Sequence, residues 1–268
     1  MSQSTIAASG TPTSLTVQDM PSPSPLFVAG LGRSGTTAIL DVLAAHPEIA
    51  LGVERYKGLW GDLDRMGPEL FARERFFDFE DGLTNLRPQD ARRWQEHYAR
   101  MAAKWDSARY VGDKMTTVRI QKVWQRHPDA RFVCIVRTVE EVAHSWHQRA
   151  ANVLDLTWPE SYNARLAVQR QNVGLGRIRR ARRQRPDLVA VVEHARFFGD
   201  PEGKSLLRLL DWLDLDWTPE IEAAFDAAHA AYVGRIARKP RILPPEDLQF
   251  IAEHTDPKLW SDVTEMAM

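Results

Sequence analysis

The sequence contains almost no cysteine. Cys134 is the only one in 268 residues, and it lies inside the apolar run RFVCIV at 131–136. A thiol in such a run is far more often a buried strand residue than a nucleophile. One cysteine cannot build a disulfide framework within the chain, which suits a reducing compartment. The composition therefore excludes a small disulfide-stapled scaffold.

Long apolar runs and a dominant charge are also missing. No stretch of about 18 or more apolar residues is available to span a membrane, and the N-terminus has neither the basic start nor the apolar centre of a signal peptide. We therefore expect a cytoplasmic protein. The 35 basic and 36 acidic residues leave a net charge of −1. We expect no nucleic-acid partner, and any anion site must be local.

Residues 1–24 are rich in Ser, Thr and Pro and poor in large apolar side chains. Such a segment cannot bury enough surface to offset its ordering entropy, so we predict a flexible tail. The remaining chain, 25–268, is long enough to bury a full core, and we predict a single domain there. An oligomer is compatible with the sequence.

Short apolar runs alternate with helical patterns over this domain. Strands are predicted at 25–31, 109–114, 131–137 and 187–194, with a further short strand ending near Glu54. Helices are predicted at 36–46, 87–107, 117–127, 138–154, 159–185, 203–215 and 219–233, and the segment 244–254 ends the ordered pattern. Residues 52–82 show no lasting period and predict loops and short helices over one face. Strands separated by helices predict an α/β, P-loop-like fold of three layers, in which a central parallel sheet carries helices on both faces.

Three loops leave predicted strands with a cation close behind an apolar run. They are GLGRSGTT at 30–37, GDKMTT at 112–117 and VRTVEEVAHS at 136–145, and their cations are Arg33, Lys114 and Arg137. Because the carboxyl ends of parallel strands meet at one edge of a sheet, these loops should converge. The sequence therefore predicts an anion site at this edge.

The first loop has the composition of an oxyanion cradle. Its glycines let the backbone approach a ligand closely. The amides of Gly35, Thr36 and Thr37 open a helix, so their N–H groups and the helix dipole point at the loop. Hydroxyls of Ser34, Thr36 and Thr37 add hydrogen-bond donors. A glycine turn that binds nothing explains neither these hydroxyls nor Arg33.

The loop nevertheless departs from the phosphate-binding motif of nucleotide triphosphatases. That motif reads Gly-x-x-x-x-Gly-Lys-Ser/Thr, and here Gly30 and Gly35 have the right spacing but Thr36 replaces the lysine. A nucleoside-triphosphate kinase with an atypical loop stays as an alternative, with Asp113 as its candidate metal-binding carboxylate. A non-catalytic adenine-nucleotide-binding protein is a second alternative.

Taken together, the motifs resemble those of a known family. RSGTT follows a strand, HPEI follows at 46–49, a lysine ends the next strand, and Ser145 lies eight residues after Arg137. This combination resembles the sulfotransferases that use 3′-phosphoadenylyl sulfate (PAPS), in their bacterial type. The resemblance implies that the donor's 5′-phosphosulfate is cradled by Arg33, Ser34, Gly35, Thr36 and Thr37, and its 3′-phosphate by Arg137 and Ser145. PAPS would be the co-substrate, and the family needs no metal.

The resemblance is specific from about residue 25 to residue 153 and looser beyond. The segment GRIARKP at 234–240 resembles the basic loop that closes over the 3′-phosphate, which implies a role for Arg238 and Lys239. Two departures stand out. Val139 replaces a proline common in the family, and the run HAR at 194–196 replaces Tyr-Glu-Asp, so a tyrosine contact to the adenine is not expected.

Sulfuryl transfer needs cations beside the developing charge and a base for the acceptor hydroxyl. Arg33 and Lys114 are the candidate cations. The cytosolic members place a histidine two residues after the lysine, but Thr116 stands there. The position of Glu54 relative to RSGTT and HPE is similar to that of the catalytic glutamate in tyrosylprotein sulfotransferases, so the resemblance implies that Glu54 is the base.

Several of these features also have explanations that involve no function. Glu54 could be a surface residue paired with Arg55 or Lys57. The histidines at 144 and 147 have the i, i+3 spacing of metal ligands but lack a carboxylate set, so no metal site is expected. The run RIRRARRQR at 177–185 predicts a solvated helix face.

The acceptor is the least determined part. We predict a hydroxyl compound: a small molecule, a carbohydrate, a lipid or a peptidyl tyrosine. The aromatic segment 54–77 and the helix 138–155 are expected to wall its pocket, although core packing explains the aromatic side chains equally well.

Overall fold

Five apolar runs of the sequence form one parallel sheet in the computed structural model, which describes residues 22–152, 154–155, 158–236 and 243–268. The strands are β1 (Ser24–Ala29), β2 (Ile49–Val53), β3 (Tyr110–Met115), β4 (Arg131–Val136) and β5 (Val189–Glu193). Their order across the sheet is β2-β3-β1-β4-β5, and each neighbouring pair is parallel. The predicted α/β class is confirmed.

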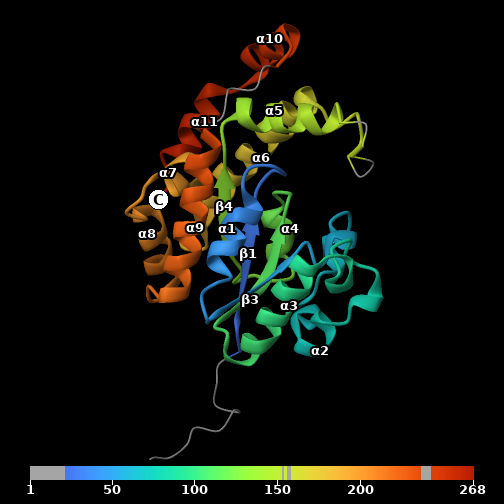
Figure 1. Cartoon of the computed structure of the whole chain (residues 1–268), viewed down its shortest axis with the longest axis vertical. Helices are drawn as coiled ribbons and strands as arrows, with labels where there is room; N and C mark the ends of the chain where they lie inside the picture. The colour runs from blue at the N-terminus through green and yellow to red at the C-terminus, as the bar shows by residue number, and fades with distance from the viewer. Residues whose placement is uncertain (1–21, 153, 156–157, 237–242) are drawn as a thin grey trace, which may run out of the picture.

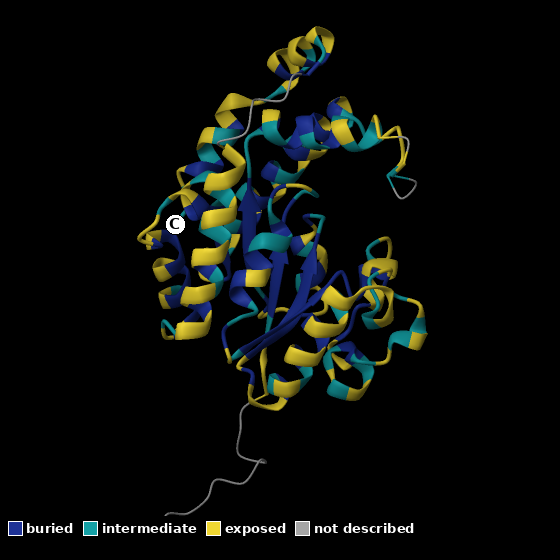
Figure 2. Cartoon of the chain, viewed as in Figure 1, coloured by how far each residue is buried: buried dark blue, intermediate teal, exposed yellow. Residues whose placement is uncertain are grey.

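Alternate residues of each strand enter two different cores. In β1, Leu26 and Val28 belong to one buried cluster, and Phe27 and Ala29 belong to the other. The other strands divide in the same way, because successive side chains of a strand point to opposite faces. The sheet is therefore the middle of three layers, and Figure 2 shows its strands buried between helices whose outer turns are exposed.

The helices divide between the two faces. The face of Leu26 is covered by α1 (Thr36–Leu43), α7 (His194–Gly199), α8 (Lys204–Leu213) and α9 (Pro219–Ile236). The face of Phe27 is covered by α3 (Arg92–Lys104), α4 (Ile120–Trp124), α6 (Ala164–Gln184) and α11 (Pro257–Thr264). Two further helices, α5 (Val139–Ala150) and α10 (Pro245–His254), pack with α6 beyond the sheet.

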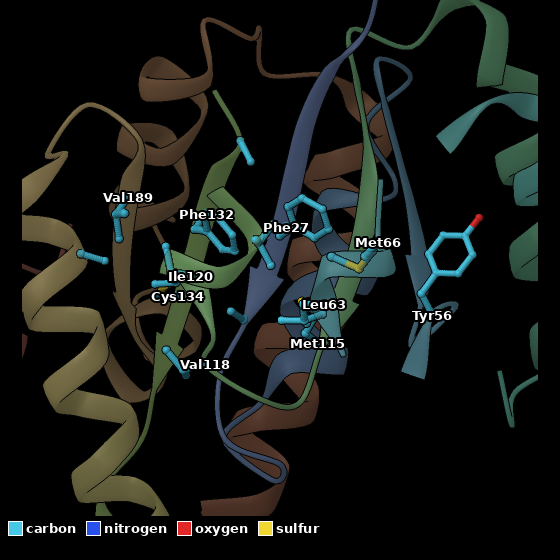
Figure 3. Close-up of a cluster of buried hydrophobic side chains, with 14 of the residues drawn as sticks. Phe27, Tyr56, Leu63, Met66, Met115, Val118, Ile120, Phe132, Cys134 and Val189 are labelled. Atoms are coloured by element: carbon cyan, nitrogen blue, oxygen red, sulfur yellow. The ribbon is translucent and has the colours of Figure 1, made fainter. Parts of the chain in front are cut away.

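The connection from β2 to α3 is built from short turns, as predicted for residues 52–82. It contains α2 (Arg73–Phe76) and the 3₁₀ turns η2 (Lys57–Leu59), η3 (Leu63–Arg65), η4 (Pro68–Phe71), η5 (Phe79–Asp81) and η6 (Pro88–Asp90). The turn η7 (Trp105–Ser107) follows α3. Figure 3 shows part of this layer, with Leu63 near Met115 and Met66 near Phe27, in the same buried cluster as Phe132. The two phenylalanine rings stack with centroids 5.4 Å apart.

Several element ends differ from the sequence prediction. The strand β1 begins at Ser24, one residue inside the predicted tail. The long basic helix begins at Ala164 and not near 159, because the Asn163 side chain accepts a hydrogen bond from the Leu166 N–H and caps it. The chain also stays ordered beyond 254. Helix α11 follows, and the Met268 N–H donates to the Val191 carbonyl of β5.

Cys134 lies where the sequence placed it, inside the sheet. It is fully buried in β4, and burial raises the pKa of its thiol to about 12. The thiol is therefore protonated at neutral pH and takes the role of a small apolar core residue.

The parallel sheet brings four chain segments to one edge. The loops that follow β1 and β4, the turn after β2 and the end of β3 all lie at the carboxyl ends of the strands, and α5 crosses above β1 and β4 there (Figure 1). Lys114 pairs with Val28 on one side and Val53 on the other. The sheet register thus places the strand-end lysine beside both the first loop and Glu54.

Gly112 provides a test of this register. It pairs with Leu26, and a Cβ at position 112 would overlap the Leu26 carbonyl oxygen. We predict that Gly112→Ala lowers the free energy of unfolding by about 3 kcal/mol or more, since the backbone of a central strand cannot yield. As a control, Gly176→Ala in α6 meets no atom within 4 Å and should raise it by up to about 1 kcal/mol. Urea unfolding measures both, and equal effects would contradict the register.

Candidate active site

The loop between β1 and α1 is held open by its own backbone. Arg33 and Gly35 adopt left-handed conformations, with φ of 76° and 100°. Only glycine suits position 35, because a Cβ there would lie 2.5 Å from the His194 ring. Trp146 of α5 ties the loop down from the other side, since its indole N–H donates to the Gly32 carbonyl at 2.8 Å. The loop is thus fixed before any ligand arrives.

Ser34 serves the loop itself. Its hydroxyl donates to the Leu31 carbonyl at 2.7 Å, its own N–H donates to the same carbonyl at 3.0 Å, and the residue is 2% exposed. The side chain predicted to contact an anion therefore closes the turn beneath it. Thr36 and Thr37, in contrast, line the cleft described below.

Helix α1 begins at this loop. Gly35 is its N-cap, and Thr36 is its first residue. The N–H groups of the first turn have no carbonyl partner inside the helix, and the positive end of the helix dipole adds to their field. The first turn of α1 therefore opens onto the loop at which the sequence predicts an anion site.

The three predicted phosphate ligands Arg33, Arg137 and Ser145 lie together. The Arg33 Nε donates to the Ser145 hydroxyl at 3.0 Å, and an Arg137 Nη1 donates to the Arg33 carbonyl at 3.3 Å. Glu141 holds the other end of the Arg137 fork at 2.7 Å. Residues more than a hundred positions apart thus form one group at the sheet edge, as the loop convergence predicts.

Glu54 and Lys114 form a close ion pair. Lys114 Nζ lies 2.7 Å from Glu54 Oε1, and the two side chains are 2% and 11% exposed. Lys57 approaches the other carboxylate oxygen at 3.2 Å. The backbones are joined as well, since the Glu54 N–H donates to the Lys114 carbonyl at 3.0 Å. The carboxylate predicted as a base is thus bracketed by two cations.

Opposing effects set the pKa of Glu54. Burial is the largest single effect and would raise the pKa of the carboxyl, but the charges and hydrogen bonds of Lys114 and Lys57 outweigh it and hold the pKa below its ordinary value. Glu54 is therefore ionised at neutral pH and able to accept a proton. A nearby anion that drew Lys114 away would make the carboxylate a stronger base.

Asp113 fixes the turn that carries Glu54. Its buried carboxylate accepts the N–H groups of Arg55 at 3.0 Å, Tyr56 at 3.2 Å and Lys114 at 2.9 Å. Glu54 sits at the head of this turn in a left-handed conformation, with φ of 52°. Asp113 is fully buried and committed to the backbone, which argues against the metal-binding role of the kinase alternative.

The surface-pair alternative for Glu54 is wrong for Arg55. The Arg55 side chain is fully buried and turns away from Glu54, donating to the Phe76 and Asp78 carbonyls and pairing with Asp81 at 2.8 Å. Arg55 therefore anchors the connection after β2. Glu54 itself is a buried residue, so its pairing with Lys57 occurs inside the site.

A cleft of about 530 Å³ collects these groups. Its walls include Gly32, Arg33, Gly35, Thr36, Thr37, Glu54, Lys114, Thr116 and Arg137. The full lining carries seven basic side chains, since Lys57, Arg93, Arg149 and Arg235 join the predicted three, against two carboxylates, Asp41 and Glu54. A chain with a net charge of −1 thus concentrates positive charge at one place.

His194, the first residue of the run that replaces Tyr-Glu-Asp, is a neighbour of the loop, and the sequence did not predict this contact. It is 1% exposed, it contacts the Gly35 position, and its two ring nitrogens have no hydrogen-bond partner within the described residues. Burial is the main cause that lowers its pKa to about 3, with the Arg137 charge adding to it. The ring is therefore neutral and serves as a wall behind the loop.

The aromatic segment and the arginine run have structural explanations that involve no ligand. Tyr56 and Phe76 of the aromatic segment are fully buried in the core, so core packing explains them. In the arginine run of α6, Arg179 forms an ion pair with Asp262 of α11 at 2.6 Å.

Membrane and metal features can be stated only for the described part of the chain. No helix there is long and apolar enough to cross a bilayer, and the same residues contain no group of three or more His, Cys, Asp or Glu side chains suited to a metal ion. Arg238 and Lys239, predicted at the 3′-phosphate, lie outside the described residues.

Comparisons with known proteins bear on the family and the fold of this chain. A family model described as "Sulfotransferase family" matches residues 25–219. No curated protein shows a significant match. The sulfotransferase domain of the Synechococcus PCC 7002 olefin synthase aligns at 16% identity over 90% of this chain and 98% of that chain, with a TM-score of 0.50. Sulfotransferase STF1 from Mycobacterium tuberculosis H37Rv aligns at 17% identity over 88% and 78%, also with a TM-score of 0.50. Mouse sulfotransferase SULT7A1, solved with PAP, aligns at 11% identity over 93% and 84%, with a TM-score of 0.46.

The ion pair predicts a pH-dependent stability. Glu54→Gln should lower the free energy of unfolding by about 3 kcal/mol near neutral pH, because it leaves Lys114 buried without its carboxylate. The folded pKa of Glu54 lies below its ordinary value of 4.5, so the stabilisation is present above that pH and is lost as the pH falls through the folded pKa. Urea unfolding near neutral pH and at a pH below the folded pKa of Glu54 measures this. The difference in the free energy of unfolding between the wild type and the variant should be smaller at the lower pH. A difference that stays constant would contradict the pairing.

Proposed function

The chain belongs to the sulfotransferase family, and on this basis we propose that it transfers the sulfuryl group of PAPS to the hydroxyl of an acceptor. The observation that carries the proposal is the cleft at the strand ends, where Arg33, Lys114 and Arg137 arrive from three different strands beside Glu54. PAPS carries phosphate at both ends of its ribose, and such a cleft suits it.

The two anionic ends of PAPS fit two parts of the cleft. The first turn of α1 holds the 5′-phosphosulfate through its N–H groups and through Thr36 and Thr37, which line the cleft. Arg137 and Ser145, which both contact Arg33, hold the 3′-phosphate. The buried Arg137 Nε has no hydrogen-bond partner within the described residues, which supports a ligand there. Ser34 supports the loop from beneath.

Glu54 acts as the base in the transfer step. Its carboxylate accepts the proton of the acceptor hydroxyl while the hydroxyl oxygen forms a bond to sulfur. The bond between sulfur and the 5′-phosphate oxygen breaks on the opposite side, and that oxygen keeps the electron pair. The products are a sulfate ester and adenosine 3′,5′-bisphosphate (PAP), and Glu54 returns the proton to water.

Lys114 and Arg33 stabilise the charge that develops on the leaving oxygen. Lys114 also controls the base. When its ammonium has a second anion within reach, the bond to Glu54 at 2.7 Å weakens, and the pKa of the carboxyl rises toward the working pH. Preparation of the base thus follows donor binding.

The two alternatives make different demands on the same residues. A kinase needs a carboxylate for Mg²⁺ near the loop, and Asp113 is committed to three backbone N–H groups. A nucleotide sensor needs Arg137 but gives Glu54 no task, although Glu54 lies inside the cleft. Both are less well supported than sulfuryl transfer.

Other parts of the proposal concern the whole protein. Residues 25–268 form the functional domain. The protein is cytoplasmic, and Cys134 is expected to be reduced in that compartment. The acceptor is a small molecule, a carbohydrate, a lipid or a peptidyl tyrosine. PAPS is the co-substrate, and no metal takes part.

Donor binding can be measured without an acceptor. We expect PAP to raise the melting temperature of the protein in EDTA, and ATP with Mg²⁺ to have little effect. Arg137→Ala should weaken PAP binding by about 2 kcal/mol, or about thirtyfold in Kd, because a charge-assisted contact is lost. Arg92→Ala, on the exposed side of α3 and paired only with Glu96 among the described residues, is the matched control. Stabilisation by ATP alone would overturn the proposal.

Glu54→Gln separates catalysis from donor binding. The variant should bind PAP as the wild type does but lose transfer from ³⁵S-labelled PAPS by at least about a hundredfold, the scale of a lost general base. The best acceptor from a panel of simple phenols and alcohols serves for the assay. Retention of transfer within about tenfold would show that another residue is the base.

A further inference from the structure

A second cavity of about 580 Å³ adjoins the donor cleft. It lies between α1, α3 and α9, and its lining includes Asp41, Arg93, His97, Arg100, Lys104 and Glu220. Asp41 and Arg93 also line the donor cleft, and they form an ion pair at 2.7 Å. The two hollows therefore meet at this ion pair.

Helix α1 forms a common wall of both hollows. Thr37, Ala38 and Asp41 line the donor cleft, and Asp41, Ala44 and Ala45 line the second cavity. Thr37, Ala38 and Asp41 lie on one face of the helix, and Ala44 and Ala45 belong to the turn that directly follows its last residue, Leu43. The helix has eight residues and is about 12 Å long. A molecule lying along α1 would thus extend from the transfer site into the cavity.

The cations of the second cavity are not balanced by its carboxylates. Asp41 is paired with Arg93, and the Glu220 carboxyl is held by its own N–H and by Thr218 at the start of α9. Arg100 makes no hydrogen bond or ion pair within the described residues and has Lys104 as a neighbour of like charge.

Lys104 is the most constrained of these cations. Its Nζ donates to the Ala44 and His46 carbonyls at 2.6 Å each, and no carboxylate forms an ion pair with it among the described residues. Burial and then the Arg100 charge lower its pKa to about 8. His97 adds no charge of its own, since it lies against the Leu51 carbonyl and burial is the main cause that lowers its pKa to about 4.

Arg100 is exposed to solvent and therefore accessible to a ligand. A bound anion would pair with Arg100 and would offset the repulsion between Arg100 and Lys104. We propose that this cavity binds an anionic group on the acceptor. The acceptor is then a hydroxyl compound that carries a carboxylate, sulfate or phosphate about 12 Å from the hydroxyl, the length of α1. The proposal rests on the proposed sulfuryl transfer and narrows its substrate class.

Rigid phenols of matched length test the proposal. The probes are 4′-hydroxybiphenyl-4-carboxylate, its neutral carboxamide and the 4-aminomethyl compound, titrated calorimetrically into protein saturated with PAP. We expect the carboxylate to bind at least about tenfold more tightly than the carboxamide, and the cation to bind most weakly.

Variants assign the binding to the cavity. Arg100→Gln should abolish the preference for the carboxylate, whereas Arg92→Gln, on the same helix and paired with Glu96, should keep it. Lys104→Met is a second variant, used if its melting temperature shows that it folds. Inorganic sulfate, titrated in the same way, is the remaining arm.

The outcomes are distinct. Failure to bind PAP would remove the proposed function itself. Normal PAP binding with equal affinity for the carboxylate and the carboxamide, or a preference that survives Arg100→Gln, would overturn the cavity proposal alone. Binding of free sulfate without any preference among the phenols would make the cavity an inorganic-anion site and would equally overturn it.

Discussion

The ion pair between Glu54 and Lys114 is the interaction on which the rest of the site depends. Two opposite charges with little access to solvent are costly unless each satisfies the other. The parallel register supplies that condition, because it sets Val53 opposite Lys114 and leads the chain directly to Glu54. Asp113 then fixes the turn through three backbone N–H groups. Fold and chemistry therefore share the same few contacts.

The proposed donor site lies where a nearly neutral chain concentrates positive charge. Positive side chains are gathered at one sheet edge, where loops from several strands meet, and the first turn of α1 adds its unpaired N–H groups. The loop carries threonine where a triphosphate-binding loop carries lysine. Arg33, from within the loop, and Lys114, from β3, bring positive charge to the cleft instead.

Much of this architecture can be predicted from the sequence. The strands and the three loops are visible because apolar runs and glycines are local signals, and parallel pairing then implies that Arg33, Lys114 and Arg137 converge. The proposed role of Glu54 rests on its resemblance to a family pattern, and the structure places the residue beside Lys114.

Other features depend on contacts between distant segments, and no local pattern reveals them. Ser34 looks like a ligand residue, yet its hydroxyl is used by the Leu31 carbonyl. His194 follows β5, and Gly35 follows β1 in the same sheet, with β4 between the two strands. The sheet order therefore brings His194 against Gly35. Helix α11 is short, and its packing on α6 and β5 decides its place. The second cavity likewise arises from α1, α3 and α9 together.

The central claim is that Lys114 restrains Glu54 until the donor is bound. The most direct measurement is the pKa of the Glu54 carboxyl, followed by ¹³C NMR with and without PAPS in the absence of an acceptor. The account predicts a pKa below the ordinary value of 4.5 in the free protein and a clearly higher pKa with PAPS bound, because the sulfuryl group draws on Lys114 and adds negative charge nearby. A pKa that stays the same or falls on PAPS binding would contradict it.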